Sequence, residues 1–340
     1  MKNFGIFSNY FGYSIGGSEY SIFKYLQEKE SAGWKIVVFL NSNPRGYNAK
    51  LFKMQLPSTW EIREYRLPFQ FVRFRYISYV LNKYTLFKIA TTMNDINTLA
   101  LYGHTAPAIV KKFNGKSLFF VRDVYSLGLD ENCYDGLSRF FFNIYLILQS
   151  PFKLFWIKDL YFCLNKSKII ANSRYISNLA RCTFGKKRIQ IIYPDIDFKN
   201  LKKEFLLARN SNIKKGIILI GDHVTKGSLI FRRIAKKMPY LNFYIFDKKY
   251  EKMEKISNIT LMPWTSRGVL FNHANMLLMP SLINEAFGRS IVEARSLGIP
   301  VLSSDRGGLP EAIGNKFFLV RPLDDIDQWI TKIKIALYTK

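Results

Sequence analysis

Residues 280–314 read PSLINEAFGRSIVEARSLGIPVLSSDRGGLPEAIG, a stretch in which strands, loops and helix starts follow one another closely. The apolar run 276–279 predicts a strand that ends just before it. Residues 286–297 predict a helix, and residues 300–303 predict the next strand. Gly307 and Gly308 then form a glycine turn before another helical segment. Strands that alternate with helices in this way predict parallel β-α-β units.

The helix start near Gly288 predicts an anion site, because unpaired backbone amides gather there and glycine lets a phosphate approach the main chain. Glu285 and Glu293 lie eight residues apart around this start. Carboxylates that faced a phosphate would repel it, so they fit better as acceptors of neutral hydroxyls, one on a sugar and the other on a ribose. Taken alone the pattern is weak, since glutamates at helical spacing usually lie on a solvated face.

The same alternation continues outward from this stretch and predicts an α/β fold with two Rossmann-like, doubly wound domains facing a cleft. A charged segment, 199–215, reads as the link between them. The predicted divisions are residues 1–198, residues 199–325 and a C-terminal helix, 326–340, packing near the domain junction. Strands are predicted at 3–8, 34–40, 118–121, 168–171, 216–220, 241–246 and 259–262.

The charge of the chain is strongly positive. Its 340 residues include 51 lysines and arginines against 25 acids, a net charge of +26, and 48% hydrophobic residues, which argues against disorder. Such a field attracts polyanions: nucleic acid, anionic lipid headgroups or phosphorylated substrates. No nucleic-acid-binding motif occurs in the sequence, so we do not expect a nucleic-acid partner.

One basic, aromatic stretch, Arg63 to Lys88, indicates a peripheral contact with an anionic membrane. We expect a helix there, with a core stripe of Phe71, Phe74, Ile77 and Leu81. The alternative is a core helix with a solvated basic face. No transmembrane helix is expected, because the longest apolar run, 140–148, is short and is followed by Pro151. Without a signal-peptide pattern, a cytoplasmic location at the inner face of the membrane is expected.

The segment from Glu285 to Glu293, EAFGRSIVE, closely resembles the Glu-x7-Glu donor-site signature of family 4 retaining glycosyltransferases, the glycosyl transferases group 1 with the GT-B fold. The continuation GIPVLSSDRGGLPEAIG resembles the next strand and turn of that family. The resemblance implies that Glu285 contacts the transferred sugar and Glu293 the ribose. It also implies that the backbone from Phe287 and Gly288 to Arg289 and Ser290 holds the diphosphate.

Further stretches extend this resemblance over most of the chain. Gly16 and Gly17 stand where the family has its N-terminal glycine loop, which would lie against the diphosphate or the acceptor. Gly221 and Lys226 fit the glycine and lysine that bracket the diphosphate. Asp222 departs from the pattern, because the family commonly has arginine there. It must turn away from a phosphate, or Arg267 or Arg289 must compensate.

A second departure concerns catalysis. Many relatives have a histidine after the strand that corresponds to 118–121, and this chain has Arg122 and Asp123 there. Arg122 is a candidate electrostatic donor to sugar or acceptor, and Asp123 a candidate to orient it. His104, after another strand, is equally consistent with a catalytic group and with an ordinary loop imidazole.

The expected function is retaining transfer of a hexose-type sugar from a nucleoside-diphosphate sugar to a hydroxyl acceptor, in cell-surface glycan or glycolipid assembly. The acceptor, a glycan or a lipid-linked molecule, would bind the N-terminal domain and the donor the C-terminal domain. No metal cofactor is expected, because no Asp-x-Asp motif follows a strand end. The departures at Asp222 and Arg122 leave open a catalytically silent binding or scaffold subunit, and the charge leaves open, less favourably, a nucleic-acid-binding protein.

Overall fold

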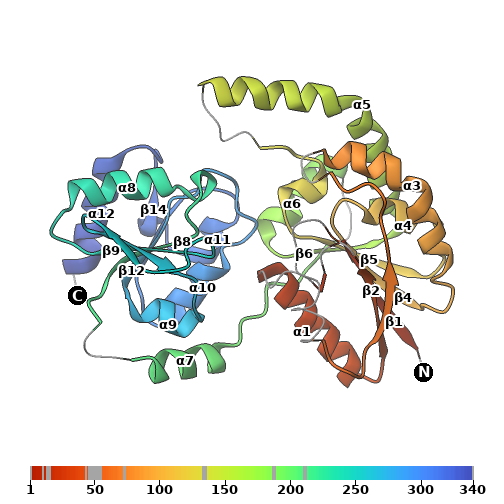
Figure 1. Ribbon diagram of the computed structural model, residues 1–340, viewed down its shortest axis with the longest axis horizontal. Helices are drawn as coiled ribbons and strands as arrows, with labels where there is room; N and C mark the ends of the chain where they lie inside the picture. Colours follow the sequence, from red (N-terminus) through yellow and green to blue (C-terminus); the bar gives the residue numbers. More distant parts are fainter. Residues whose placement is uncertain are drawn as a thin grey trace. The chain divides into compact units, whose positions relative to one another are not determined.

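The computed structural model describes residues 2–9, 11–12, 17–42, 44, 56–71, 74–131, 136–185, 189–209 and 213–338. The chain divides into two compact units, Met1–Asp195 and Ile196–Lys340, each built on a β-sheet with helices on both faces (Figure 1).

The N-terminal unit contains, within the described residues, a seven-stranded sheet in the order β3-β2-β1-β4-β5-β6-β7, with every pairing parallel. The part 3-2-1-4-5-6 is the order of a Rossmann fold. Its strands are β1 (Asn3–Phe7), β2 (Lys35–Asn41), β3 (Glu61–Tyr65), β4 (Thr98–Tyr102), β5 (Lys116–Val121), β6 (Lys168–Ala171) and β7 (Ile189–Ile191). Its helices are α1 (Gly17–Ser31), α3 (Arg75–Thr91), α4 (Ala106–Lys112), α5 (Gly136–Lys166) and α6 (Arg174–Phe184), with a 3-10 turn, η1 (Val124–Leu127).

The C-terminal unit repeats this architecture. Its described strands follow the order β10-β11-β9-β8-β12-β13-β14, and β10 alone among them runs antiparallel to its neighbour. They are β8 (Gly216–Ile220), β9 (Phe243–Asp247), β10 (Glu254–Ile256), β11 (Ile259–Pro263), β12 (Ala274–Met279), β13 (Val301–Ser304) and β14 (Leu319–Val320). Its helices are α7 (Phe198–Leu207), α8 (Ser228–Lys237), α9 (Arg267–Asn272), α10 (Arg289–Ser296), α11 (Leu309–Ile313) and α12 (Ile326–Tyr338), with 3-10 turns η2 (Val224–Lys226) and η3 (Lys316–Phe318).

The strands form where apolar residues run consecutively, as expected for parallel strands that are covered on both faces. Residues 36–40 of β2 are all buried. On one face of the sheet, Ile36 and Val38 share a core with Ile22 and Leu26 of helix α1. In the C-terminal unit, helices α8 and α12 share one core, in which Trp329 of α12 is fully buried. The last helix thus packs against α8 within its own unit.

The structure corrects the expected helix over 63–88. Residues Glu61–Tyr65 form strand β3, and the helix runs from Arg75 to Thr91. The expected core face is also wrong: Phe71, Phe74 and Leu81 are exposed, whereas Tyr76 and Tyr79 are buried. The tyrosines can be buried because their hydroxyl groups have partners on neighbouring elements. The Tyr79 hydroxyl, for example, donates to Asp159 over 2.8 Å.

The apolar run 140–148 belongs to a longer helix than the sequence indicated. Helix α5 continues through Pro151 to Lys166, and Ser138–Lys166 is long and apolar enough to cross a membrane by length and composition. Proline removes one helical hydrogen bond and kinks a helix without necessarily ending it. Figure 1 shows α5 bending between a first part that extends away from the other helices of its unit and a second part beside them.

Candidate functional site

The first cluster lies in the C-terminal unit, around the loop that follows β12. Glu285 in this loop accepts a hydrogen bond from the Ser281 hydroxyl at 2.8 Å and pairs with the Lys226 ammonium at 2.5 Å. Lys226 belongs to η2, the turn after β8. Two neighbouring parallel strands, β8 and β12, therefore end in loops that bring a carboxylate and a cation together.

Close backbone contacts hold these loops in place. A Cβ atom on Gly227, whose φ is +76°, would lie 1.9 Å from the Pro280 carbonyl oxygen. A Cβ atom on Gly307 would lie 2.3 Å from the Glu285 carbonyl oxygen, which also accepts a 2.6 Å hydrogen bond from the Gly308 amide. Glycine is needed at Gly227 and Gly307, since any side chain would push the loops apart.

Helix α10 begins at Arg289, three residues later than expected. Gly288 has a φ of +101°, in the left-handed region, so the chain enters the helix only after this residue. Glu285 therefore lies in the loop before the helix and Glu293 in its second turn. The first amides of α10, at Arg289 and Ser290, lie between these two carboxylates in the sequence and form the kind of helix start that binds anions. Phe287 is half-buried beside the core of this unit.

Glu293 is 3% exposed and is held by two arginines. Its Oε1 accepts from the Arg289 Nε at 2.9 Å, and its Oε2 lies 3.4 Å from the Arg267 Nε. Within the described residues, Glu293 Oε2 and Arg267 Nη1 are buried atoms without a hydrogen-bond partner. Buried polar atoms are rarely left unsatisfied, so this pair indicates a place where a ligand donates and accepts hydrogen bonds.

Asp222, the departure beside Gly221, turns to its own partners. Gly221 has a φ of +92°, and after it Asp222 pairs with Arg232 at 2.8 Å and Lys249 at 2.9 Å and accepts a bond from the Tyr250 hydroxyl. Burial raises the pKa of Asp222, but the bonds from Tyr250 and Lys249 and the charge of Arg232 outweigh it and hold the pKa below its ordinary value. The charge of Asp222 is thus neutralised by neighbouring cations.

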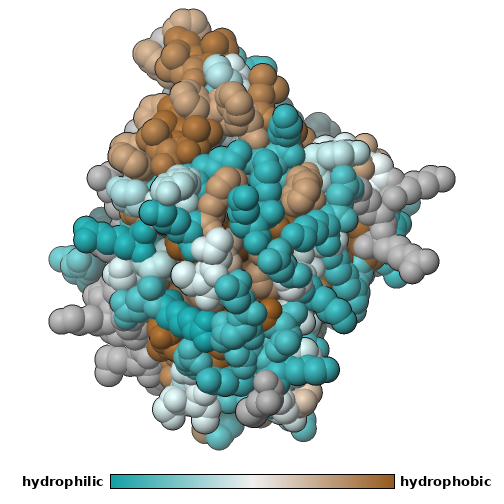
Figure 2. Space-filling model, turned by 90° about the vertical axis from the view of Figure 1, so that its right-hand side faces the viewer, coloured by the Kyte–Doolittle hydropathy of each residue, from teal (hydrophilic) through white to brown (hydrophobic). Residues whose placement is uncertain are grey.

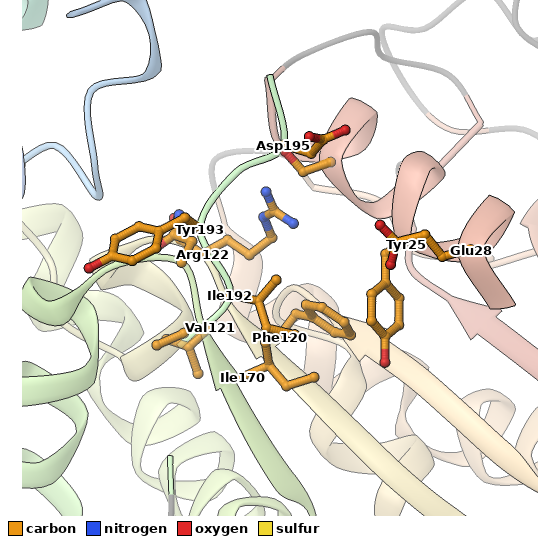
Figure 3. A pocket seen from close by; sticks show the side chains of 12 residues that line it. Tyr25, Glu28, Phe120, Val121, Arg122, Ile170, Ile192, Tyr193 and Asp195 are labelled. Atoms are coloured by element: carbon orange, nitrogen blue, oxygen red, sulfur yellow. The ribbon is translucent and has the colours of Figure 1, made fainter. Parts of the chain in front are cut away.

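The second cluster is a pocket in the N-terminal unit at the ends of β5 and β6 (Figure 3). Arg122 directly follows β5, is 8% exposed, and its carbonyl oxygen accepts from the Asn172 side chain at 3.0 Å. Figure 3 shows the Arg122 side chain extending to the part of the pocket where Glu28 and Asp195 lie. The pocket combines this guanidinium with acidic and aromatic side chains, among them Tyr25, Phe120 and Tyr193.

Asp123 directly follows Arg122, and His104 follows strand β4. Neither residue lines the pocket. Asp123 caps η1, where its Oδ1 accepts from the amide and the hydroxyl of Ser126, both at 2.7 Å. These contacts give Asp123 a structural role at the start of η1. Burial, and then the charge of Arg75, lowers the pKa of His104 to about 4, so its imidazole is neutral near pH 7. The Trp156 indole donates to the His104 carbonyl oxygen at 2.7 Å.

The structure brings together Lys226, Glu285, Gly288, Arg289 and Glu293 in the C-terminal unit, and places Arg122 in the other unit. Gly17 begins helix α1, and Gly16 lies outside the described residues. Sequence reasoning did not select Ser281, and it named Arg267 only as a possible compensation for Asp222. The sequence signal for Ser281 and Arg267 is weak, because each residue only lies next to an apolar strand. The folded chain shows that Ser281 contacts Glu285 and that Arg267 contacts Glu293.

Comparisons with known proteins bear on the family and the fold of this chain. Residues 243–339 match the model of the family glycosyl transferases group 1. Sulfoquinovosyl transferase SQD2 of Arabidopsis thaliana is 27% identical over 159 residues. That match spans 42% of this chain and only 30% of the length of the relative.

Solved structures resemble the whole chain. Sucrose-phosphate synthase from Thermosynechococcus elongatus has a TM-score of 0.71 at 15% identity, over 99% of this chain and 90% of that one. Anabaena HepE, solved with UDP and glucose, has a TM-score of 0.66 at 15% identity, over 100% of this chain and 90% of that one. The fold is therefore GT-B, as expected from the sequence, and the resemblance to glycosyl transferases group 1 is confirmed.

Proposed function

We propose that this chain is a glycosyltransferase that moves a sugar from a nucleoside-diphosphate sugar to a hydroxyl acceptor, with the donor held by the C-terminal unit. The observation that carries the proposal is the arrangement around α10. A cation and a carboxylate, Lys226 and Glu285, meet just before the helix start, and a buried carboxylate with an unsatisfied oxygen, Glu293, lies in its second turn.

The nucleotide part of the donor fits this arrangement. The diphosphate would lie against the amides of Arg289 and Ser290 and the Lys226 ammonium, which together favour negative charge. A ribose hydroxyl would donate to Glu293 Oε2, which has no hydrogen-bond donor within the described structure. Among the relatives of the same fold, Anabaena HepE binds UDP and glucose.

The sugar part would interact with Glu285. Lys226 pairs with Glu285, and a diphosphate bound beside them would compete for the ammonium. Glu285, still bonded to Ser281, could then accept hydrogen bonds from sugar hydroxyls. A carboxylate that accepts hydrogen bonds from several hydroxyl groups favours a hexose-type donor.

The chemistry follows from where charge develops. When the bond from sugar to phosphate breaks, negative charge grows on the leaving diphosphate, and Lys226 with the α10 amides stabilises it. We propose a retaining reaction in which a donor phosphate oxygen assists the attack of the acceptor on the same face. The acceptor, a glycan or lipid-linked hydroxyl, would bind the N-terminal unit at the Arg122 pocket. No resident metal is required, so a chelator should leave the rate unchanged.

A screen of nucleoside-diphosphate sugars by thermal shift tests the donor proposal. A donor at about 100 times its dissociation constant should stabilise the protein by roughly 2.7 kcal/mol. Hits are then assayed for hydrolysis and for transfer to hydroxyl acceptors. Failure of every donor to stabilise the protein would overturn the proposal, and binding without turnover would identify a silent binding subunit.

Glu285→Gln tests the role of the carboxylate. Loss of hydrogen bonds to a charged acceptor should lower turnover by about 10- to 100-fold with an unchanged melting temperature. Glu254→Gln, on exposed strand β10, is the matched control and should turn over at the wild-type rate. Wild-type turnover by Glu285→Gln would contradict the assigned role.

A further inference from the structure

Helix α5 carries a long stripe of large apolar side chains that the described residues leave exposed. Phe140, Ile147, Leu154 and Tyr161 recur every seven residues, and so do Phe141, Leu148, Phe155 and Phe162. All eight are between 41% and 69% exposed. Residues seven apart lie two turns apart on one side of a helix, so within each part of the bent helix α5 the two series form a stripe on one side.

This stripe is not the inner face of a core helix. Only 11% of the apolar window in Ser138–Lys166 is buried. In the second half of α5, a different set of residues faces the protein and is buried against α3 and α4. This set includes Trp156, Asp159, Leu160 and Cys163. Figure 2 shows hydrophobic residues gathered at the top of the molecule, where the first part of α5 lies in Figure 1.

The charges on α5 are those of a helix that meets an anionic surface. Arg139 and Lys158 are exposed, and Lys158 lies within the stripe, four residues after Leu154. The described acid of α5 is Asp159, which is 2% exposed at its side chain and is neutralised by Lys83 and Lys111. At a bilayer surface, lysine can bury its stem and keep its ammonium among the headgroups. A second copy of α5 would instead press Lys158 against apolar residues without an acid to pair with it.

The inner side of α5 decides how the helix can meet a bilayer. To span a membrane, its second half would have to leave α3 and α4 and expose Asp159 and its lysine partners to lipid. Ionised groups in the bilayer centre are costly, so spanning is disfavoured. A helix lying in the interface buries one face by about 5–10 Å and leaves the other face on the protein.

We propose that α5 is an interfacial membrane-binding helix, which inserts its exposed stripe into the surface of an anionic bilayer and lies in the plane of that surface. Insertion of aromatic and aliphatic side chains supplies the apolar part of binding, and Arg139 and Lys158 select anionic headgroups. The neighbouring helix α3 also exposes apolar and basic side chains, namely Leu81, Tyr84 and Lys88.

This location differs from the one expected from sequence, the stretch from Arg63 to Lys88. Several of its cations are already paired: Arg63 with Asp95, Arg75 with Asp130 and Lys83 with Asp159. They stabilise the N-terminal unit, and reversing them would damage the protein with or without a membrane. Arg73 lies outside the described residues. The proposal is independent of sugar transfer, because membrane binding is measured without donor or acceptor.

Co-sedimentation of the full chain with vesicles tests the proposal. The vesicles are phosphatidylcholine alone, or phosphatidylcholine mixed with phosphatidylglycerol, at low salt and at about 1 M salt, where charges more than about 3 Å apart are screened. The test variant is Ile147→Gln with Leu148→Gln. Its matched control is Leu206→Gln with Leu207→Gln on helix α7, an adjacent leucine pair that is 53% and 77% exposed. All four positions are exposed, so both variants should melt as the wild type does.

The wild type should bind the mixed vesicles more tightly than phosphatidylcholine, and should keep part of that binding at high salt. The α5 variant should lose about tenfold or more in partition coefficient, and the α7 control less than about twofold. Lys158→Glu should weaken binding at low salt only, in contrast to Lys202→Glu on α7.

Three results would overturn the proposal. The first is vesicle binding that the α5 variant leaves unchanged. The second is an equal loss in the α5 and α7 variants. The third is a wild type that does not bind vesicles. If that protein also forms a concentration-dependent dimer in size-exclusion chromatography, and the α5 variant does not, the stripe would be assigned to a second copy of the chain.

Discussion

At the scale of single residues, the contact between Lys226 and Glu285 is the one that a donor would have to change. The ammonium is 2.5 Å from the carboxylate, and both side chains are partly accessible, at 36% and 16%. Such a pair can be broken at little net cost, because partly exposed ion pairs contribute about 0–1 kcal/mol. The site thus keeps its cation available for a phosphate.

Lys226→Ala should therefore weaken donor binding by about tenfold or more, because a charge-assisted hydrogen bond to phosphate is lost. It should also make the dissociation constant less sensitive to salt. Titration calorimetry at two salt concentrations measures both effects. Lys236→Ala, at an exposed position of α8, is the control and should bind as the wild type does. An unchanged salt dependence in Lys226→Ala would argue against a phosphate contact.

His104 should make the free energy of unfolding depend on pH. Its pKa is about 4 in the folded protein against an ordinary value of 6.5. As the pH falls below 6.5, His104 becomes protonated in the unfolded chain but stays neutral in the folded chain. The free energy of unfolding should therefore fall with pH until the pH reaches about 4. Burial also lowers the pKa of His273, which contributes in the same direction.

Urea unfolding at pH 7 and pH 5 isolates the contribution of His104. Wild type should lose more stability between these values than His104→Gln, whose side chain cannot take up the proton. The same loss in both proteins would show that the His104 imidazole is readily protonated in the folded state.

At the scale of elements, Asp159 joins three helices. From α5 it accepts from the Tyr79 hydroxyl of α3 at 2.8 Å, and it pairs with Lys83 of α3 at 2.5 Å and Lys111 of α4 at 2.8 Å. Asp159→Asn keeps the size of the side chain but removes its charge. Leaving two lysines without their partner should lower the free energy of unfolding by about 3 kcal/mol.

Asp327→Asn is the matched control for Asp159→Asn. Asp327 pairs with Lys237 at 2.6 Å on the surface, where the two side chains are 79% and 52% exposed. Loss of this ion pair should lower the free energy of unfolding by less than about 1 kcal/mol. Urea unfolding compares the two variants. Equal costs would show that Asp159 does not hold the helices together.

The same helices show what the sequence could and could not predict. Alternating apolar runs predicted most of the central strands. Gly288 and the two glutamates of the predicted donor site lie in one unit. Periodicity failed for α3, because buried Tyr79 depends on Asp159, which is 80 residues away. The roles expected for Arg122 and Asp123 came from the family resemblance and stay predictions. Adjacent in sequence, one lines a pocket and the other caps a 3-10 turn.

At the scale of the whole molecule, the proposed donor contacts all lie in Ile196–Lys340. Bound nucleotide should therefore slow amide hydrogen exchange most in the C-terminal unit, at residues 223–228 and 285–296, because ligand binding suppresses local opening. Exchange measured by mass spectrometry with and without nucleotide checks this. Protection confined to the N-terminal unit would contradict the proposed location of the donor.

The position of β1 in its sheet has a consequence for how the chain folds during synthesis. β1 is made before both of its partners, β2 and β4, and the second of these ends at Tyr102. At about 5–20 residues per second, translation needs on the order of 5–20 s to supply that partner. During this time one edge of a strand with four buried residues stays unpaired. Such non-local pairing is slow and exposes the nascent chain to aggregation, so the protein should depend on chaperones until β4 has left the ribosome.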